Sequence, residues 1–372
     1  MTLDDQLEVY RRQISTDAYP MSIGELANLY RDGELNIHPE FQRLFRWTPG
    51  QRTRLIESIL LGIPLPSLFV AASEEGWDVV DGVQRLSTIF SFMGILLGEE
   101  GEALPPFRCE AAPFLSALDG MMYDDPVEDG ASLTAAQRID FKRSRVDLKI
   151  IKRESDKRAK YDLFQRLNSF GSHATDQELR NALLVSISKP HFEWLTSLAA
   201  DSNFLESLNL PSRSLDEQYH VEIALRFVTL RKIGESHLRT MGYLSEFLNS
   251  QIVPLTDRSI ESLAEEDLVF RKTFELLNQS AGPDVLRKWN SEKSRAEGPF
   301  SATAFEVLAL GVGYYDAAEQ IDADLVSDKR KILWATEQFQ PGFSQGIRAD
   351  QRIRISVPFG RALFGGESSP NV

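Results

Sequence analysis

Scarce residue types narrow the class of this protein before any motif is considered. The single cysteine, Cys109, excludes an internal disulfide and a cysteine-based zinc site, and we interpret it as a small buried residue. The five histidines show no spacing typical of paired metal ligands. No uncharged apolar run reaches the roughly 18 residues of a membrane span, and the charged N-terminus is unlike a secretory signal. We therefore expect a cytoplasmic protein that does not contact a membrane.

Basic charge is also scarce, and it is unevenly distributed. The 372 residues carry a net charge of -14, which argues against a surface covered with phosphate-binding side chains. Residues 95–135 contain nine acids and one base, whereas residues 138–166 contain eleven bases and five acids. Such a basic run is usually a solvated face, and the alternative is a surface that contacts nucleic-acid phosphates.

Hydrophobic periodicity predicts an α+β chain with its strands in the first half. Beyond about residue 155 we expect helices only, and we find no internal repeat. The expected helices before that point are 22–30, 48–63 and 83–96, and the expected strands are 67–73, 77–80 and 146–155. The domain prediction is a helical lead over 1–20, a mixed domain over 21–190 with an acidic insertion at 97–135, a helical domain over 191–345 and a basic tail over 346–372.

The stretch "WDVVDGVQRLSTIF", residues 77–90, reads as a strand, a glycine and a helix. The first N–H groups of such a helix lack intrahelical partners and favour an anion. With Val83 and Leu86 facing the core, we expect Gln84, Arg85 and Thr88 on or near the open side. Arg85 is suited to a bidentate phosphate contact, and Asp81 to a metal, a water or a ribose hydroxyl. On spacing alone, however, an aspartate that merely caps the helix is the favoured interpretation.

Two further blocks combine amides, bases and aromatics. In "PEFQRLFRW", Gln42 and Arg43 stand among aromatic residues, which suits stacking with phosphate binding and equally suits aromatic anchors beside solvated arginines. In "LFQRLNSFGSHATDQELRNAL", the segment 168–171 interrupts a helix, and Thr175 with Glu178 forms a capping box that needs no function.

The order of these three blocks resembles the N-terminal domain of GmrSD-type restriction endonucleases, a family similar to the ParB and sulfiredoxin fold. The resemblance is dense over residues 21–190, and the segment "RADQRIRISVPFGRALFG" is similar to the tail of stand-alone members. It implies an α+β architecture, with a small ParB/sulfiredoxin-like mixed α/β domain followed by an all-helical C-terminal domain.

The resemblance also implies a site. The family's Asp-Gly-Gln-Gln-Arg motif, associated with nucleotide binding and hydrolysis, falls on residues 81–85 and implies catalytic roles for Asp81, Gln84 and Arg85. A nucleoside triphosphate (GTP, ATP or CTP) with Mg²⁺ is the implied cofactor, and Asp81 is the implied metal ligand. The implied nucleotide-binding residues are Gln42, Arg43, Gly82, Arg85, Thr88, Asn168 and Gly171.

This sequence departs from the family pattern at two places. Val83 replaces the first glutamine of the motif. If that glutamine contributes to hydrolysis, we expect this chain to bind nucleotide but to hydrolyse it poorly. If the glutamine only packs in the core, the replacement should have little effect on hydrolysis. No histidine follows His237, so we expect no His-Asn-His nuclease within this sequence.

These patterns and the resemblance suggest three functions. The first is a nucleotide-binding regulator or sensor of a bacterial anti-phage or restriction-type defence system, with or without NTP hydrolysis, and with a protein partner from the same operon or a second copy of itself. The second is a ParB-like reader of DNA or modified DNA, or the partner-neutralising subunit of a two-gene toxin-type pair. A nuclease that uses carboxylates such as Asp81 and Glu57 has the least support. The DNA-binding candidates are Lys142, Arg143, Arg145, Arg348, Arg352, Arg354 and Arg361.

Overall fold

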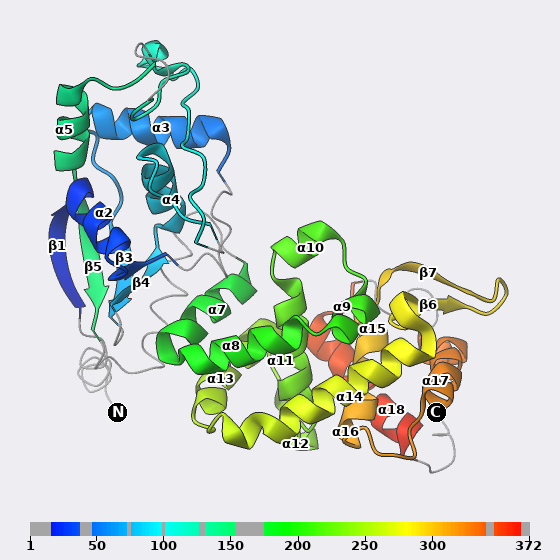
Figure 1. The fold of residues 1–372 in the computed structure, drawn as a ribbon. Helices are drawn as coiled ribbons and strands as arrows, with labels where there is room; N and C mark the ends of the chain where they lie inside the picture. The colour runs from blue at the N-terminus through cyan, green and yellow to red at the C-terminus, as the bar shows by residue number, and fades with distance from the viewer. Residues whose placement is uncertain are drawn as a thin grey trace. The chain divides into compact units, whose positions relative to one another are not determined.

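The computed structural model describes residues 16–37, 47–72, 76–98, 101–125, 131–152, 175–339 and 346–365 (Figure 1). The chain divides into two compact units, residues 1–174 and 175–372. The division falls inside the predicted 21–190 domain, because the helix that follows Thr175 packs with the helical part of the chain. The α+β class predicted from periodicity is confirmed.

A five-stranded mixed sheet is the frame of the N-terminal unit. Its order is β1-β5-β3-β4-β2, in which β5 is antiparallel to β1 and parallel to β3. The helical lead predicted for residues 1–20 is wrong for residues 16–20, because they pair along the edge of β5 as part of a strand. Pro20 fits this edge, where its missing N–H breaks no ladder bond. The strands are β1 (Thr16–Ser22), β2 (Leu35–Asn36), β3 (Leu68–Ala72), β4 (Trp77–Asp81) and β5 (Arg145–Ile151).

Two helices of this unit begin at residues whose side chains cap them. Ser22 and Thr48 accept backbone N–H bonds at their helix starts, and Thr48 forms a capping box with Gln51. Three of the helices gather at one end of the sheet (Figure 1). The helices are α2 (Ile23–Arg31), α3 (Pro49–Leu60), α4 (Val83–Phe92) and α5 (Ala135–Arg143).

The acidic insertion is part of the N-terminal core. Its described residues between Leu97 and Thr134 contain the short turn η1 (Ser116–Leu118) and otherwise follow an irregular path. Phe107 and Cys109 are nevertheless buried with the sheet and helices. Glu57 of α3 holds the path in place, because its carboxylate accepts the backbone N–H of Phe114 at 2.7 Å. Weak periodicity therefore reflects an irregular and largely exposed path, which a few buried side chains anchor to the core.

The C-terminal unit is mostly helical, with an aromatic centre. Phe227 contacts Phe270 and Phe274, and Phe204 packs against the same two rings. The longer helices are α7 (Asp176–Ile187), α8 (Lys189–Ala199), α11 (Tyr219–Leu230), α13 (Leu244–Thr256), α14 (Ala264–Ala281), α17 (Ala323–Ala335) and α18 (Ala349–Phe364). The shorter elements are α9 (Ser202–Leu208), α10 (Ser212–Asp216), α12 (Glu235–Thr240), α15 (Ala302–Ala304), η4 (Phe305–Ala309) and α16 (Leu310–Tyr314).

Two parts of this unit differ from the sequence-based expectation. A hairpin of β6 (Arg287–Asn290) and β7 (Arg295–Phe300) interrupts the helices, so the expectation of helices alone beyond residue 155 is wrong. The predicted basic tail contains α18, which packs on η4 so closely that a Cβ on Gly360 would lie 2.4 Å from the Val307 carbonyl oxygen. Among the described residues, no helix is long and apolar enough to cross a membrane.

Candidate functional site

The step from β4 to α4 is built around Gly82. Its φ of 107° lies in the left-handed region that favours glycine, and a Cβ there would lie 2.1 Å from a methyl carbon of Leu68. Gly82, and not Asp81, is the N-cap residue of α4, so the favoured interpretation of Asp81 as the cap is wrong. The strand–glycine–helix geometry itself is confirmed.

Among the described residues, no side chain caps the N-terminus of α4. Leu86 donates the first intrahelical hydrogen bond, to the Gly82 carbonyl at 2.9 Å. The backbone N–H groups of Val83 and Arg85 donate to no acceptor among the described residues. Such orphan donors at the positive end of a helix form an anion site.

Arg85 is held by its own neighbourhood. Its Nη2 contacts the Asp81 carboxylate at 2.7 Å, and its Nη1 donates to the carbonyls of Pro66 and Ser67, the latter at 3.2 Å. These bonds tie α4 to the segment that enters β3. A bidentate phosphate contact by Arg85 would have to replace them, so in this geometry its fixed positive charge acts on an anion at the helix start through space.

Burial perturbs both members of this ion pair. Desolvation raises the pKa of Asp81 and outweighs the opposing effects of Arg85 and the Gly82 N–H. Desolvation likewise lowers the pKa of Arg85, while Asp81 opposes that change. The Asp81 carboxylate remains about one-third exposed, which leaves it accessible beside the helix start. Titratable groups perturbed in this way gather at functional sites and at structural ion pairs alike.

Gln84 and Thr88 are not on the open side of α4. Their exposures are 8% and 1%, so the expectation of an open position is wrong for both. The Thr88 hydroxyl donates to the Gln84 carbonyl at 2.7 Å, and Gln84 Oε1 accepts the backbone N–H of Trp47 at 3.4 Å. Val83 lies in the hydrophobic core at 2% exposure, as the helical pattern predicted.

The described residues around Asp81 provide no metal ligand set. Within the described ranges, no group of three or more His, Cys, Asp or Glu side chains is placed to hold a metal ion. A Mg²⁺ ion commonly keeps several waters and takes one or two carboxylates plus phosphate oxygens. Asp81 beside an anion site is therefore compatible with Mg²⁺ that arrives with a nucleotide. Gln42, Arg43, Asn168 and Gly171 lie outside the described residues.

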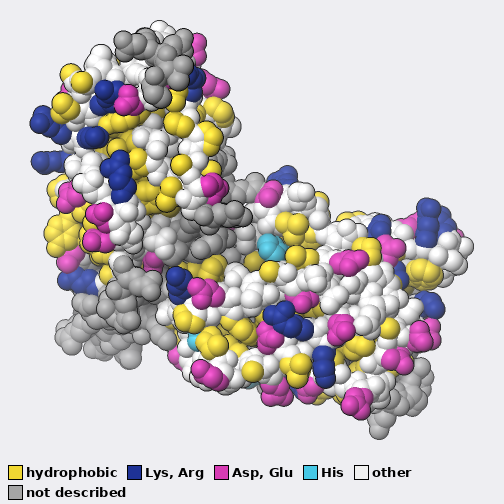
Figure 2. Space-filling model, in the orientation of Figure 1, with side chains coloured by type: hydrophobic (Ala, Val, Ile, Leu, Met, Phe, Trp, Pro, Cys, Tyr) yellow, Lys and Arg dark blue, Asp and Glu magenta, His cyan; other side chains and the backbone are white. Residues whose placement is uncertain are grey.

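The basic candidates separate into two groups. Lys142, Arg143 and Arg145 are exposed at the end of α5 and the start of β5, and they form no ion pair with any described residue. Figure 2 shows Lys and Arg side chains gathered beside α5. This group is available to an external polyanion.

The C-terminal arginines have intramolecular contacts instead. Arg352 is only 12% exposed and pairs with buried Glu306 at 2.7 Å. Arg348 pairs with Asp350 at 2.8 Å, and Arg354 donates to the Met241 carbonyl. Arg361 donates to the Ile233 carbonyl at 2.7 Å. Their partners lie up to 130 residues away along the chain, so the basic composition of this segment does not reveal its structural role.

A buried polar network in the helical unit escaped the sequence analysis. Arg180 is almost fully buried, pairs with Glu222 at 2.5 Å and donates to Asn249 at 3.0 Å. Arg226 contacts the same Glu222. Arg180 belongs to the block "QELRNA", and its partners on α11 and α13 are set by tertiary packing.

The fold and this step define a mixed α/β domain in which β4 leads through Gly82 into α4, whose start has two backbone N–H groups without an acceptor among the described residues. Residues 23–185 match the model of one protein family, described as the GmrSD restriction endonuclease, N-terminal domain. No curated protein and no solved structure matches the chain significantly. This match, over less than half of the chain, confirms the resemblance to the GmrSD N-terminal domain seen in its motifs. The name of this family indicates a restriction-type role, which is a defence function that involves DNA. The ParB/sulfiredoxin-like description of the fold stays a prediction.

Proposed function

We propose that the N-terminal domain binds a nucleoside triphosphate, with its phosphates at the start of α4, and acts as a nucleotide-dependent regulator or sensor in a restriction-type defence system. The observation that carries the proposal is the uncapped start of α4. Backbone N–H groups of Val83 and Arg85 have no acceptor among the described residues, and a phosphate oxygen supplies one. The buried guanidinium of Arg85 adds positive charge next to them.

Asp81 is the reason that we expect nucleotide binding to require a divalent cation. A carboxylate beside a phosphate is repulsive unless a cation lies between them. Asp81 would hold a Mg²⁺ ion that arrives with the nucleotide, and that ion would supply the positive charge that offsets the repulsion. Asp81 is suited to this role because its carboxylate is partly exposed and already oriented by the Gly82 N–H and by Arg85.

Val83 limits what the site does with a bound triphosphate. Its side chain points into the core and is apolar, so it neither orients a water nor stabilises charge. Turnover, where it occurs, depends on Asp81 and Gln84. The proposal therefore concerns binding first, and phosphate release is measured separately.

Isothermal titration of the full chain with GTP, ATP and CTP in Mg²⁺ tests the proposal. Arg85→Ala should weaken binding by about tenfold or more, since it removes a charge near the phosphates. Arg54→Ala is the matched control, because Arg54 is an exposed arginine of the same unit on α3. Since Arg85 also holds the segment before β3, circular dichroism must show that the variant is folded. Absence of binding by the native chain to all three nucleotides would refute the proposal.

A second function, DNA contact by Lys142, Arg143 and Arg145, is favoured by a separate observation. These three side chains are exposed and form no ion pair with the described residues. Each phosphate contact with duplex DNA steepens the dependence of log K on log salt by about 0.9. If all three bind phosphates, replacing them with alanine should reduce the slope by about 2.7.

Filter binding at several salt concentrations measures that slope. The control replaces Lys293 and Arg295 with alanine, since both are exposed cations of the hairpin that pair with Glu297. The control should leave the slope unchanged. Binding that is insensitive to salt, or equal in the triple variant and the native chain, would exclude this second function.

A further inference from the structure

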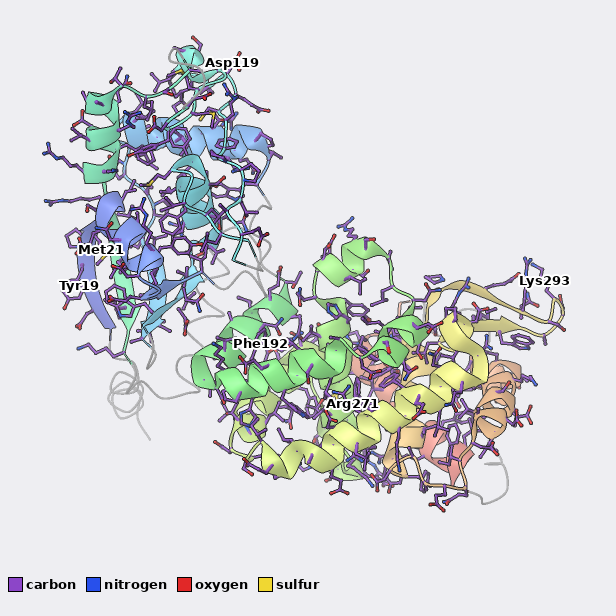
Figure 3. The ribbon with its side chains drawn as sticks, in the orientation of Figure 1. Tyr19, Met21, Asp119, Phe192, Arg271 and Lys293 are labelled. Atoms are coloured by element: carbon purple, nitrogen blue, oxygen red, sulfur yellow. The ribbon has the colours of Figure 1, made fainter. Side chains whose placement is uncertain are left out.

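A groove lies across one face of the sheet in the N-terminal unit, about 560 Å³ in volume. Asp17, Tyr19 and Met21 alternate along β1 and therefore point to the same face. Figure 3 labels Tyr19 and Met21 on this strand. Ile150 is opposite Asp17 on β5, and Ala72 is opposite Trp77 across β3 and β4. Small and aliphatic side chains thus form the floor, while the two aromatic side chains rise at its sides.

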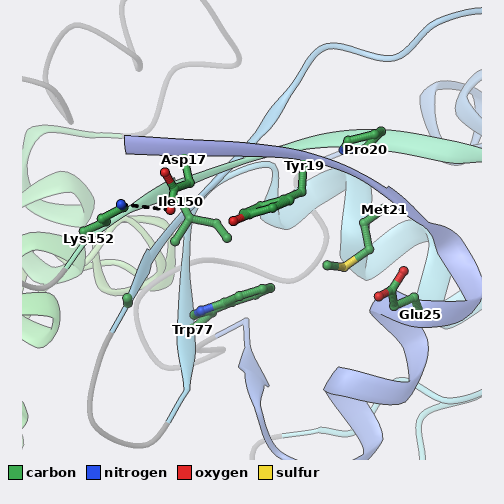
Figure 4. A pocket seen from close by; sticks show the side chains of 9 residues that line it. Asp17, Tyr19, Pro20, Met21, Glu25, Trp77, Ile150 and Lys152 are labelled. Carbon is green, nitrogen blue, oxygen red and sulfur yellow. Dashed lines mark ion pairs between the residues drawn. The ribbon is translucent and has the colours of Figure 1, made fainter. Parts of the chain in front are cut away.

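Tyr19 and Trp77 face each other across this groove. Figure 4 shows the two rings on opposite sides of the opening, one from the edge strand β1 and one from β4. Tyr19 is 51% exposed although it is a large aromatic residue. Isolated exposed rings are common, but two rings that face each other over a shallow floor offer stacking surfaces to a planar group.

The polar groups of the groove set the edge chemistry of that planar group. Asp17 pairs with Lys152 at 3.0 Å at one end, and Glu25 of α2 lies at the other end (Figure 4). Two carboxylates and one ammonium give no surplus of positive charge, so the groove does not select phosphate. Carboxylate oxygens accept hydrogen bonds from exocyclic amino groups of bases.

The basic residues beside the groove determine the kind of ligand. Ser22, next to Met21, pairs with Arg145 across the sheet, and Ile23 donates to the Ser144 carbonyl at 2.9 Å. Lys142 and Arg143, at the end of α5, therefore lie close to the Met21–Glu25 end of the groove, whereas Arg145, like its partner Ser22, points to the opposite face of the sheet. Such a cluster repels a cationic peptide and attracts a phosphate backbone.

We propose that this groove binds an unstacked nucleobase of a single-stranded nucleic-acid segment, between Tyr19 and Trp77, while the adjacent basic residues contact its phosphates. The inference rests on the second function, DNA contact by Lys142, Arg143 and Arg145. It is independent of nucleotide binding at α4, because Asp81 and Arg85 do not line the groove.

Fluorescence anisotropy of the full chain with two labelled oligonucleotides of equal length tests the proposal. One is ordinary single-stranded DNA, and the other carries abasic sites with the same phosphates. The native chain should prefer the base-containing strand by about 5- to 150-fold, the range of one base–aromatic stack. Trp77→Ala and Tyr19→Ala should each reduce this preference strongly, and Tyr19→Phe should keep it.

Phe114→Ala is the matched control, because Phe114 is an exposed aromatic residue of the same unit outside the groove. Tyr19→Ala keeps the test valid if Trp77→Ala fails to fold, since Tyr19 is half exposed on an edge strand and its removal should leave the fold intact. Equal binding of the two strands by the native chain would refute base binding in the groove, while DNA contact by the basic residues would remain supported. No binding of either strand would overturn both. An arginine-containing peptide that requires Trp77 and displaces the strand would also overturn the assignment.

Discussion

Replacing Gly82 with alanine should destabilise the N-terminal unit more than its position in a turn suggests. Two separate effects act on the added methyl group. The φ of 107° is unfavourable for any L-residue with a side chain, which costs about 1–3 kcal/mol. The Cβ would also lie 2.1 Å from a methyl carbon of Leu68, a buried residue of β3.

Relief of that overlap requires a shift in a packed core, at a further cost of about 1–3 kcal/mol. The free energy of unfolding should therefore fall by about 2–6 kcal/mol. Gly33→Ala separates the two effects, because Gly33 has a φ of 77° and no atom within 4 Å of its Cβ position. That control should cost only about 1–2 kcal/mol. Gly50→Ala should raise stability by about 0.4–1 kcal/mol, since Gly50 lies in the first turn of α3 and its added Cβ makes an ordinary contact with Glu110.

Hydrogen exchange of the β4 and α4 amides is the suitable assay, because it reports this unit separately from the helical unit. The double variant Leu68→Ala with Gly82→Ala should lose less stability than the sum of the losses of the two single variants. The difference, the coupling energy, should be about 1–3 kcal/mol. If Gly82→Ala and Gly33→Ala destabilise equally, or if the double variant shows no coupling, the close approach of Gly82 to Leu68 is refuted.

Three further predictions concern buried side chains. Val83→Gln should lower the free energy of unfolding by about 1–3 kcal/mol without creating phosphate release from NTP, because it buries an amide in the core; new turnover in a phosphate-release assay would contradict this. Glu222→Gln should destabilise the helical unit by about 3–5 kcal/mol, since Arg180 and Arg226 lose their shared charge partner; an unchanged melting temperature would count against the network. Burial raises the pKa of the Cys109 thiol to about 12, so iodoacetamide at pH 8 should modify Cys109 only in denaturant, and rapid labelling of the native chain would show the burial to be wrong.

Local signals predicted the elements that carry the site. Thr48 and Pro49 mark the start of α3 because capping and the first helical turn depend on neighbours in sequence. The alternation of "WDVV" and the helical spacing after Gly82 likewise predicted β4 and α4. Val83 was placed correctly for the same reason, since its inward position follows from the period of one helix.

Contacts between distant segments decided what the sequence could not show. A single apolar stripe indicated one buried face of α4, but Gln84 is also buried, by packing that includes the Trp47 backbone. The Asp81–Arg85 pair is local, whereas the Arg85 contact with Pro66 depends on the path into β3. Arg352 was assigned to a DNA surface on composition, and its partner Glu306 lies 46 residues away.

Gln84→Glu provides the most direct measurement of the central claim. The substitution keeps the size of the side chain and the acceptor for the Trp47 N–H, while it places negative charge at the start of α4. Titration of folded native and variant chains with a nucleoside triphosphate and Mg²⁺ should show binding by the native chain that the variant weakens by at least about tenfold, since like charges repel. Equal affinity in both chains would contradict phosphate binding at this helix start.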